Sequence, residues 1–190
     1  DRNPPRVSKN KRFAYQGGEI QPAAINHQSS STSVRQLAAD EQMIWEYALG
    51  DVTKCFGEDF SIYKGRSMQR NPNGDLQLIS RVYDLHGKRM EFEKPMTLVS
   101  EYEVPGDAWY FQKNSHSANM PYSILMEIAL QPCGFISTHS GAILTYPELD
   151  LFYRNLDGSG TLLHNTDLRG KTIVNEVKLL TTVASGNTII

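Results

Sequence analysis

Glu127 is the residue whose type and surroundings point most clearly to chemistry. It is the one charged residue between Met120 and Thr138, where apolar side chains are distributed all round a helical wheel. A helix that is apolar on every side is typically buried. Burial disfavours the charged form of a carboxyl group, so an unpaired Glu127 would have a raised pKa and could serve as a general acid. The alternative is that it bonds to a buried Arg or to backbone N–H groups and only fixes the packing.

The segment around Glu127 predicts a central helix. It is close to the length of a membrane span, but its carboxylate, its proline and the β-like segments on either side favour a helix wrapped by a sheet. Asn119 is expected to cap the helix, with Pro121 in the first turn, where its missing N–H is not needed. Pro132 should kink or end the first part near Gln131, because proline removes a helical hydrogen bond. The helix is therefore expected in two parts.

Several stretches of the sequence resemble one enzyme family. The letters WYF from Trp109, then His116, then MPYSILMEIALQPCGF from Met120 are similar to the active-site helix of hotdog-fold β-hydroxyacyl-acyl-carrier-protein dehydratases, of the β-hydroxydecanoyl dehydratase/isomerase type. The resemblance is closer still to the dehydratase region of polyunsaturated fatty acid synthases, which are polyketide-synthase-like enzymes. Three further stretches support it: GDVTKCFG, EYEVPGDAWYF and LDLFYRNLDGSGTLL. It covers roughly Leu37 to Ile190.

This resemblance implies an α+β hotdog fold, in which a curled antiparallel sheet wraps one long central helix and two hotdogs pair side by side as a double hotdog. It also implies dehydration of a 3-hydroxyacyl chain carried as a phosphopantetheine thioester. In the family, a His from one hotdog removes the α-proton, and an Asp or Glu from the helix of the other protonates the leaving β-hydroxyl. An amide at the helix N-terminus polarises the thioester carbonyl.

Carried onto this sequence, the family pattern puts Glu127 at the acid position and offers His116 as the base. The residues expected to contact substrate are Met120, Pro121, Tyr122 and Gln131. His116 lies closer to Met120 than the family's catalytic His lies to its Met-Pro, and Tyr122 replaces a small residue that usually follows Met-Pro. In the synthase relatives one hotdog of a pair often supplies mainly the helix carboxylate. This chain resembles that kind, so the partner hotdog could supply the base.

The leading hypothesis is a 3-hydroxyacyl-carrier-protein dehydratase. Its partners would be an acyl carrier protein domain, a second hotdog in cis or as a homodimer, and other synthase domains. No metal or other cofactor is expected, because the phosphopantetheine belongs to the carrier and the spacing of His116, Glu127, Cys133 and His139 matches no standard metal site. The alternatives are a pseudo-dehydratase that supports an active neighbour and binds carrier protein, and an isomerase or thioesterase acting on the same intermediates.

Composition limits these interpretations. The chain has 190 residues, a net charge of −2 and a pI near 6.2, which give no electrostatic case for nucleic acid or an anionic membrane. Two cysteines outside any C-x-x-C pattern indicate free thiols and a cytoplasmic location, with Cys133 expected to be a small buried hydrophobe. No signal peptide is visible, and a start at Asp1 indicates a piece of something longer.

Three regions are expected along the chain. Residues 1–33 have the composition of a linker. Residues 34–74 should form a helical lead-in and loop, capped by Ser33, broken at Gly50-Asp51 and stopped at Gly57. Residues 75–190 should form the hotdog domain, whose closing strand is missing. The expected strands are Leu76–Leu85, Met90–Val104 interrupted near Pro95, Leu149–Arg154, Thr172–Val183 and one beginning at Thr188–Ile190.

Overall fold

The computed structural model describes residues 34–112, 118–154, 158–186 and 188–190. The expected linker and His116 lie outside the described residues. The α-helices are α1 (Glu41–Ala48), α2 (Val52–Phe56), α3 (Trp109–Gln112) and α4 (Tyr122–His139). The short 3₁₀ turns are η1 (Glu58–Tyr63), η2 (Gly74–Leu76) and η3 (Ala142–Thr145). The strands are β1 (Leu37–Ala39), β2 (Arg81–His86), β3 (Met96–Glu103), β4 (Thr172–Leu179), β5 (Ala184–Ser185) and β6 (Thr188–Ile189).

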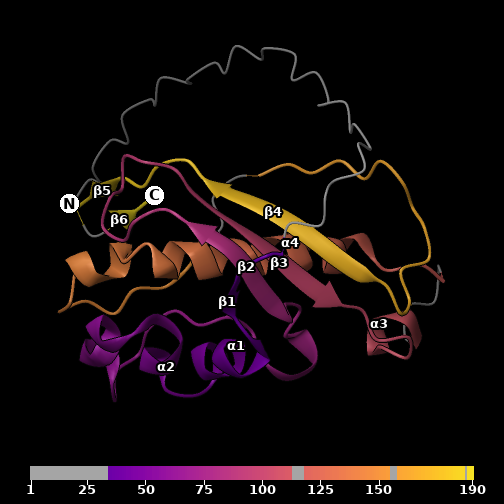
Figure 1. The fold of residues 1–190 in the computed structure, drawn as a ribbon, viewed down its shortest axis with the longest axis horizontal. Helices are drawn as coiled ribbons and strands as arrows, with labels where there is room; N and C mark the ends of the chain where they lie inside the picture. Colours follow the sequence, from indigo (N-terminus) through magenta and orange to yellow (C-terminus); the bar gives the residue numbers. More distant parts are fainter. Residues whose placement is uncertain (1–33, 113–117, 155–157, 187) are drawn as a thin grey trace, which may run out of the picture. The chain divides into compact units, whose positions relative to one another are not determined.

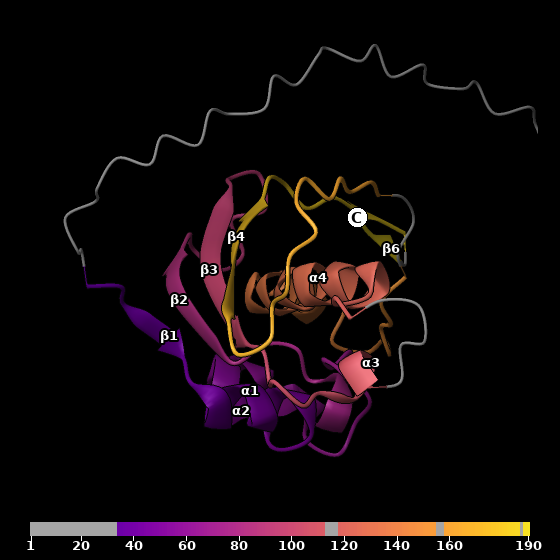
Figure 2. The same cartoon turned by 90° about the vertical axis from the view of Figure 1, so that its right-hand side faces the viewer.

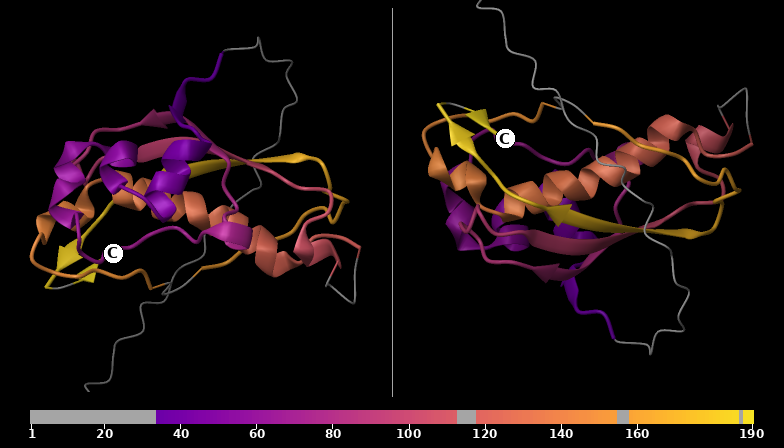
Figure 3. Two further views of the ribbon diagram at one scale, coloured as in Figure 1. Left: turned by 90° about the horizontal axis from the view of Figure 1, so that it is seen from below. Right: turned by 90° about the horizontal axis from the view of Figure 1, so that it is seen from above.

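The main sheet is antiparallel, with strand order β1-β2-β3-β4, and it curls around α4 (Figures 1 and 2). The helices α1 and α2 cover another side of α4, as the view from below shows (Figure 3). A separate hairpin joins β5 and β6. This arrangement confirms the predicted α+β hotdog fold class. No helix in the described part of the chain is long and apolar enough to cross a membrane.

The pairing of β3 with β4 determines which side chains face α4. The two strands are in continuous register from Met96 opposite Leu179 to Glu103 opposite Thr172. Alternate residues of β3 are buried, whereas β4 alternates between exposed and half-buried positions. Within the described residues β4 pairs only with β3.

Two apolar clusters hold the helix against its neighbours. The cluster at the C-terminal half of α4 is built on aromatic contacts: the ring of Phe56 lies 4.9 Å from Tyr47 and 5.0 Å from Phe135. The cluster at the N-terminal half includes Met120 and Ile128 from the α4 region, packed with residues of β3, α3 and the chain between η2 and β2. The apolar residues of α4 are therefore buried mainly on the side of the helix that faces the sheet and α1.

The prediction of a two-part helix is wrong, because α4 is continuous through Pro132. Proline cannot donate the hydrogen bond that would bind the carbonyl of Ile128. In this fold the side-chain amide of Asn175, on β4, donates to that carbonyl at 3.4 Å and to the hydroxyl of Ser100 at 3.3 Å. A strand residue thus replaces the missing helical donor. The helix begins at Tyr122, after Pro121 and not at an Asn119 cap as predicted.

The prediction that α4 is buried on all sides is also wrong. One stripe is exposed to solvent, and the prediction of a buried Cys133 fails with it. The exposed residues of α4 are Tyr122, Ser123, Ala129, Leu130 and Cys133. On this side of α4, the described residues bury the helix least.

Two predicted boundaries in the helical region before the sheet are confirmed. The lead-in breaks between α1 and α2 and stops at Gly57, whose φ of 90° favours glycine. Ser33 lies outside the described residues, and Asp40 caps α1 by accepting a hydrogen bond from the Met43 amide at 2.8 Å. Leu37 belongs to β1 and not to the predicted helix.

The three long strands of the sheet lie where they were predicted. Each is shorter than predicted, because it starts later, ends earlier, or both. The first begins at Arg81 and not at Leu76, because η2 and the bond from the Leu78 amide to Gln131 take up the residues before it. The second begins at Met96, directly after Pro95. Residues 149–154 form no strand, and the last strong strand ends at Leu179.

Gln131 pins α4 to the chain before β2. It is 3% exposed, its Oε1 accepts from the Leu78 amide at 2.8 Å, and its Nε2 donates to the Leu76 carbonyl at 2.6 Å. Leaving such buried groups unpaired costs about 1–3 kcal/mol each. Gln131→Leu should therefore lower the free energy of unfolding, measured with urea, by at least about 2 kcal/mol. The exposed neighbour change Cys133→Ser should shift it by no more than about 0.5 kcal/mol; equal stabilities of the two variants would contradict this assignment.

His139, the last residue of α4, should make stability depend on pH. Burial and the nearby Arg89 lower its pKa from 6.5 to about 4. Between these values the unfolded chain binds a proton that the folded chain does not, so stability is full above about pH 6.5 and falls as the pH drops. From pH 7.5 to 5 this contributes a loss of about 2 kcal/mol, which His139→Gln should abolish and the exposed-site control His86→Gln should retain. Urea unfolding at the two pH values checks this; an unchanged pH dependence in His139→Gln would refute it.

Candidate active site on helix α4

Glu127 lies at the middle of α4, on the edge of a hollow. Its side chain is half-buried, and its Oε1 accepts a hydrogen bond from Gln131 Nε2 at 3.1 Å. No Lys or Arg among the described residues forms an ion pair with it. Its partner is thus a side-chain amide one helical turn away, on a residue that is itself fixed by backbone groups. This arrangement holds the carboxylate in place and leaves it open to the hollow.

The hollow beside Glu127 has a volume of about 230 Å³. Its walls come from α4, the loop before η2 and the chain after η3. They are lined by Arg70, Asn71, Pro72, Glu127, Leu130, Gln131, Cys133, Gly134, Ser137 and Tyr153. A small hollow with one carboxylate, one guanidinium and mostly apolar or amide neighbours can hold a chain segment that carries a single hydroxyl group.

The loop wall is fixed by two residues that the sequence pattern did not single out. Arg70 donates to the carbonyls of Glu46, Tyr47 and Gly50 at 3.2, 2.9 and 3.0 Å, so it closes the C-terminal end of α1. Asn71 donates to the Gln131 carbonyl at 3.3 Å. Cations near the last carbonyls of a helix are stabilised by its dipole. Arg70 thus holds the loop to the end of α1, and Asn71 holds it to α4. Only the three-dimensional structure reveals these contacts.

The other predicted site residues divide between the helix start and the core. Met120 is 4% exposed and packs in the N-terminal cluster, and Pro121 is half-buried directly before the helix. Tyr122 is 46% exposed. Six residues separate Pro121 from Glu127, which corresponds to roughly 9 Å of rise along the helix. Of the predicted residues, the structure therefore brings Gln131 to Glu127 directly.

The start of α4 offers backbone amides as hydrogen-bond donors. The first intrahelical donors are the amides of Ile124 and Leu125, which both bond to the Pro121 carbonyl. The amides of Tyr122 and Ser123 therefore precede the hydrogen-bonded turns, as expected at a helix N-terminus, where the dipole also favours negative charge. Such amides can polarise a carbonyl oxygen that approaches the helix start.

A later stretch of chain crosses this helix start. A Cβ atom on Gly160 would lie 2.6 Å from the Tyr122 hydroxyl and 3.1 Å from the sulfur of Met126. Both contacting atoms lie at or near the ends of side chains, so a larger residue at position 160 would have to displace them. Arg169 extends the contact, because it donates to the Ala118 carbonyl at 2.7 Å and lies over the ring of Phe111. The aromatic residue that replaces the family's small residue is thus covered in part by the chain near Gly160.

A chain of hydroxyl groups closes the far end of the hollow. Tyr153 donates to the Gly134 carbonyl at 2.6 Å, its oxygen lies 2.7 Å from the Thr138 hydroxyl, and Thr138 lies 2.8 Å from the Tyr47 hydroxyl. Because Tyr153 donates outward, Thr138 donates to Tyr153 and Tyr47 donates to Thr138. Burial raises the pKa of both tyrosines, so they remain neutral. Sequence reasoning placed Tyr153 in a strand and missed this role.

No group of three or more His, Cys, Asp or Glu within the described ranges lies close enough together to hold a metal ion. Both cysteines are free, and burial raises the pKa of Cys55 to about 12. Cys133 is exposed as a residue, but its thiol donates to the Ala129 carbonyl at 3.3 Å and is partly covered, which raises the pKa of the thiol above its ordinary value. A thiol with a raised pKa is a poor nucleophile at neutral pH. Among the side chains that line the hollow, Glu127 is therefore the strongest candidate for proton transfer.

The sequence of this chain was compared with known protein families and proteins. No protein-family model matches it. The chain is 35% identical over 141 residues to a protein of Thraustochytrium sp. that is named as one of the subunits of a polyunsaturated fatty acid synthase. The match covers 70% of this chain and 9% of that relative, so the chain spans less than a tenth of the relative's length. We conclude that the chain is homologous to a segment of a polyunsaturated fatty acid synthase, as the resemblance of its sequence predicted.

Proposed function

We propose that this chain is a dehydratase hotdog of a polyunsaturated fatty acid synthase or a related polyketide-type lipid synthase. It would convert 3-hydroxyacyl-carrier-protein thioesters into trans-2-enoyl thioesters and water. The observation that carries this proposal is the placement of Glu127 on the central helix, held by Gln131 and open to a hollow. The homology to a synthase segment supplies the lipid-synthesis context.

In the proposed reaction, Glu127 donates its proton to the β-hydroxyl as the C–O bond breaks, and water leaves. A His base takes the α-proton, and the electrons of the C–H bond form the new double bond. The amides at the start of α4 stabilise the negative charge that develops on the thioester oxygen. His116 is one candidate for the base. The other is a His from a second hotdog.

We further propose that a second hotdog completes the site, either in cis or as another copy of this chain. The exposed stripe of α4, which includes Tyr122 and Leu130, supports pairing. An acyl carrier protein domain would deliver the substrate on its phosphopantetheine arm, and no other cofactor takes part in the proposed steps. Free thiols at Cys55 and Cys133 fit the proposed cytoplasmic location.

A second candidate function is a pseudo-dehydratase that supports an active neighbour and binds carrier protein. The observation that favours it is the crowded helix start, where the hydroxyl of Tyr122, the first residue of α4, lies close to the chain at Gly160. The presence of Glu127 at the hollow favours the catalytic function over a purely supporting one, because a supporting domain needs no proton donor there. Isomerisation of the enoyl product could use the same acid and base.

The test is dehydration of a 3-hydroxyacyl-pantetheine thioester by the full natural polypeptide that carries this chain, followed by mass spectrometry. Glu127→Gln should lower the rate by about 10²- to 10⁴-fold, because an amide cannot donate the proton that the leaving hydroxyl needs. The matched control Glu148→Gln changes an exposed carboxylate and should retain the wild-type rate.

Separate replacement of His116 by Ala assigns the base. A comparable loss in His116→Ala identifies His116 as the base, from the same copy or from a second copy of this chain, whereas an unchanged rate assigns the base to a different hotdog in cis. Full activity of Glu127→Gln would overturn the proposal and favour the pseudo-dehydratase.

A further inference from the structure

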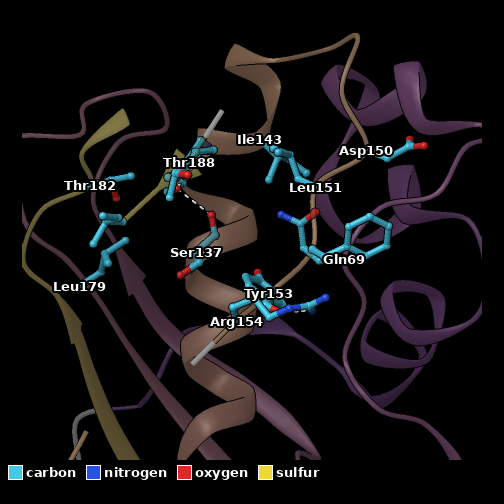
Figure 4. A pocket seen from close by; sticks show the side chains of 15 residues that line it. Gln69, Ser137, Ile143, Asp150, Leu151, Tyr153, Arg154, Leu179, Thr182 and Thr188 are labelled. Atoms are coloured by element: carbon cyan, nitrogen blue, oxygen red, sulfur yellow. Dashed lines mark hydrogen bonds between the residues drawn. The ribbon is translucent and has the colours of Figure 1, made fainter. Parts of the chain in front are cut away.

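Two hollows outside the candidate active site differ in their chemistry. One, of about 480 Å³, lies at the C-terminal end of α4, where Ile143, Leu151 and Leu179 contribute to its largely apolar walls (Figure 4). The other, of about 440 Å³, lies between the start of α1, η2, the end of β3 and α3. We call this second one the acidic hollow. The charged side chains that line it are Glu41, Asp75, Arg81, Glu103 and Asp107.

The acidic hollow carries an excess of negative charge. Its arginine, Arg81, already pairs with Glu103 on the same wall. Glu41, Asp75 and Asp107 form no ion pair within the part of the chain that the structure describes. Such a group of unpaired carboxylates attracts a cation and repels an acidic partner.

Aromatic side chains form another wall of the acidic hollow. Trp109, on α3, donates from its Nε1 to the Asp75 carbonyl at 3.1 Å, which fixes the indole beside η2. The ring centroids of Trp109 and Tyr110 lie 5.5 Å apart, with the ring planes at 75°. Tyr102, on β3, adds a third ring. Cations bind over the faces of aromatic rings, and most strongly over Trp. This wall is therefore suited to an ammonium or guanidinium group.

The two tyrosines are a second, independent observation that points to a ligand. Tyr102 is 7% exposed and Tyr110 is 2% exposed, and both line the acidic hollow. Their hydroxyl oxygens lie 3.1 Å apart, so one hydroxyl donates and the other accepts. The hydrogen of the accepting hydroxyl then has no acceptor among the described residues. Because a buried donor without an acceptor is costly, a ligand that brings an acceptor to this wall is favoured.

The ligand must therefore combine a cation with a hydrogen-bond acceptor. An ammonium or guanidinium group alone is insufficient, because it carries donors and no acceptor. A peptide that contains Lys or Arg supplies both groups, since each of its main-chain carbonyls accepts a hydrogen bond.

We propose that the acidic hollow is a docking site for a basic peptide segment of another synthase domain. The Lys or Arg side chain of that segment lies between the carboxylates and Trp109, and one of its carbonyls accepts from the tyrosine pair. The partner is inferred from the homology to a synthase segment. The docking site does not depend on the proposed dehydration.

Carboxylate labelling tests the docking site without measuring dehydration. The full natural polypeptide would be treated with a water-soluble carbodiimide and glycine ethyl ester, and mass spectrometry would follow each carboxylate. Asp75 and Asp107 are exposed in this chain, as is Glu148. A docked cation should slow labelling of both aspartates about tenfold relative to Glu148 at low salt, and about 1 M salt should remove this protection by screening. Aspartates labelled as fast as Glu148 at low salt, or protection that persists at high salt, would overturn the docking site.

Two double variants show whether the protection depends on the carboxylates. Asp75→Asn/Asp107→Asn removes two of them, so Glu41 should lose its own protection from labelling. The matched control Glu58→Gln/Glu176→Gln removes the same charge from exposed positions outside the hollow and should retain it. Equal protection of Glu41 in the two double variants would refute the docking site. Labelling is measured without substrate, so a failure of the proposed reaction leaves this result unchanged.

Discussion

The structure depends on the buried side-chain amide of Gln131. One amide group joins the backbone at Leu76 and Leu78 to the middle of α4 and also binds the carboxylate of Glu127. In an apolar interior each of these bonds is costly to break. The same interaction therefore fixes the helix against the chain before β2 and sets the orientation of the candidate acid, which links stability directly to the site.

The continuity of α4 is the second constraint. Pro132 would be expected to interrupt the helix, but Asn175 donates to the Ile128 carbonyl that the proline leaves free. Because the helix continues, Glu127, Ser137 and the hydroxyl chain through Thr138 lie along one element in fixed register.

The sequence was sufficient for what depends on composition and local pattern. The apolar run around Glu127 predicted the central helix, β-branched residues predicted β4, and Gly57 predicted a helix end. It was insufficient where distant residues decide the outcome. The rescue by Asn175 comes from β4, the loop contacts of Arg70 go to α1, and Tyr153 reaches Gly134 from a segment without regular structure. Periodicity carries no information about such pairings. It also could not show that one side of α4 is exposed, since an apolar residue looks the same whether it meets a core or a partner.

The measurement that tests the central claim most directly is a crystal structure of the full natural polypeptide with a non-hydrolysable 3-hydroxyacyl-pantetheine amide. The account predicts that the β-hydroxyl oxygen lies about 2.6–3.2 Å from a carboxylate oxygen of Glu127, with the thioester-mimicking carbonyl near the start of α4. An ordered ligand whose hydroxyl lies away from Glu127 would contradict it.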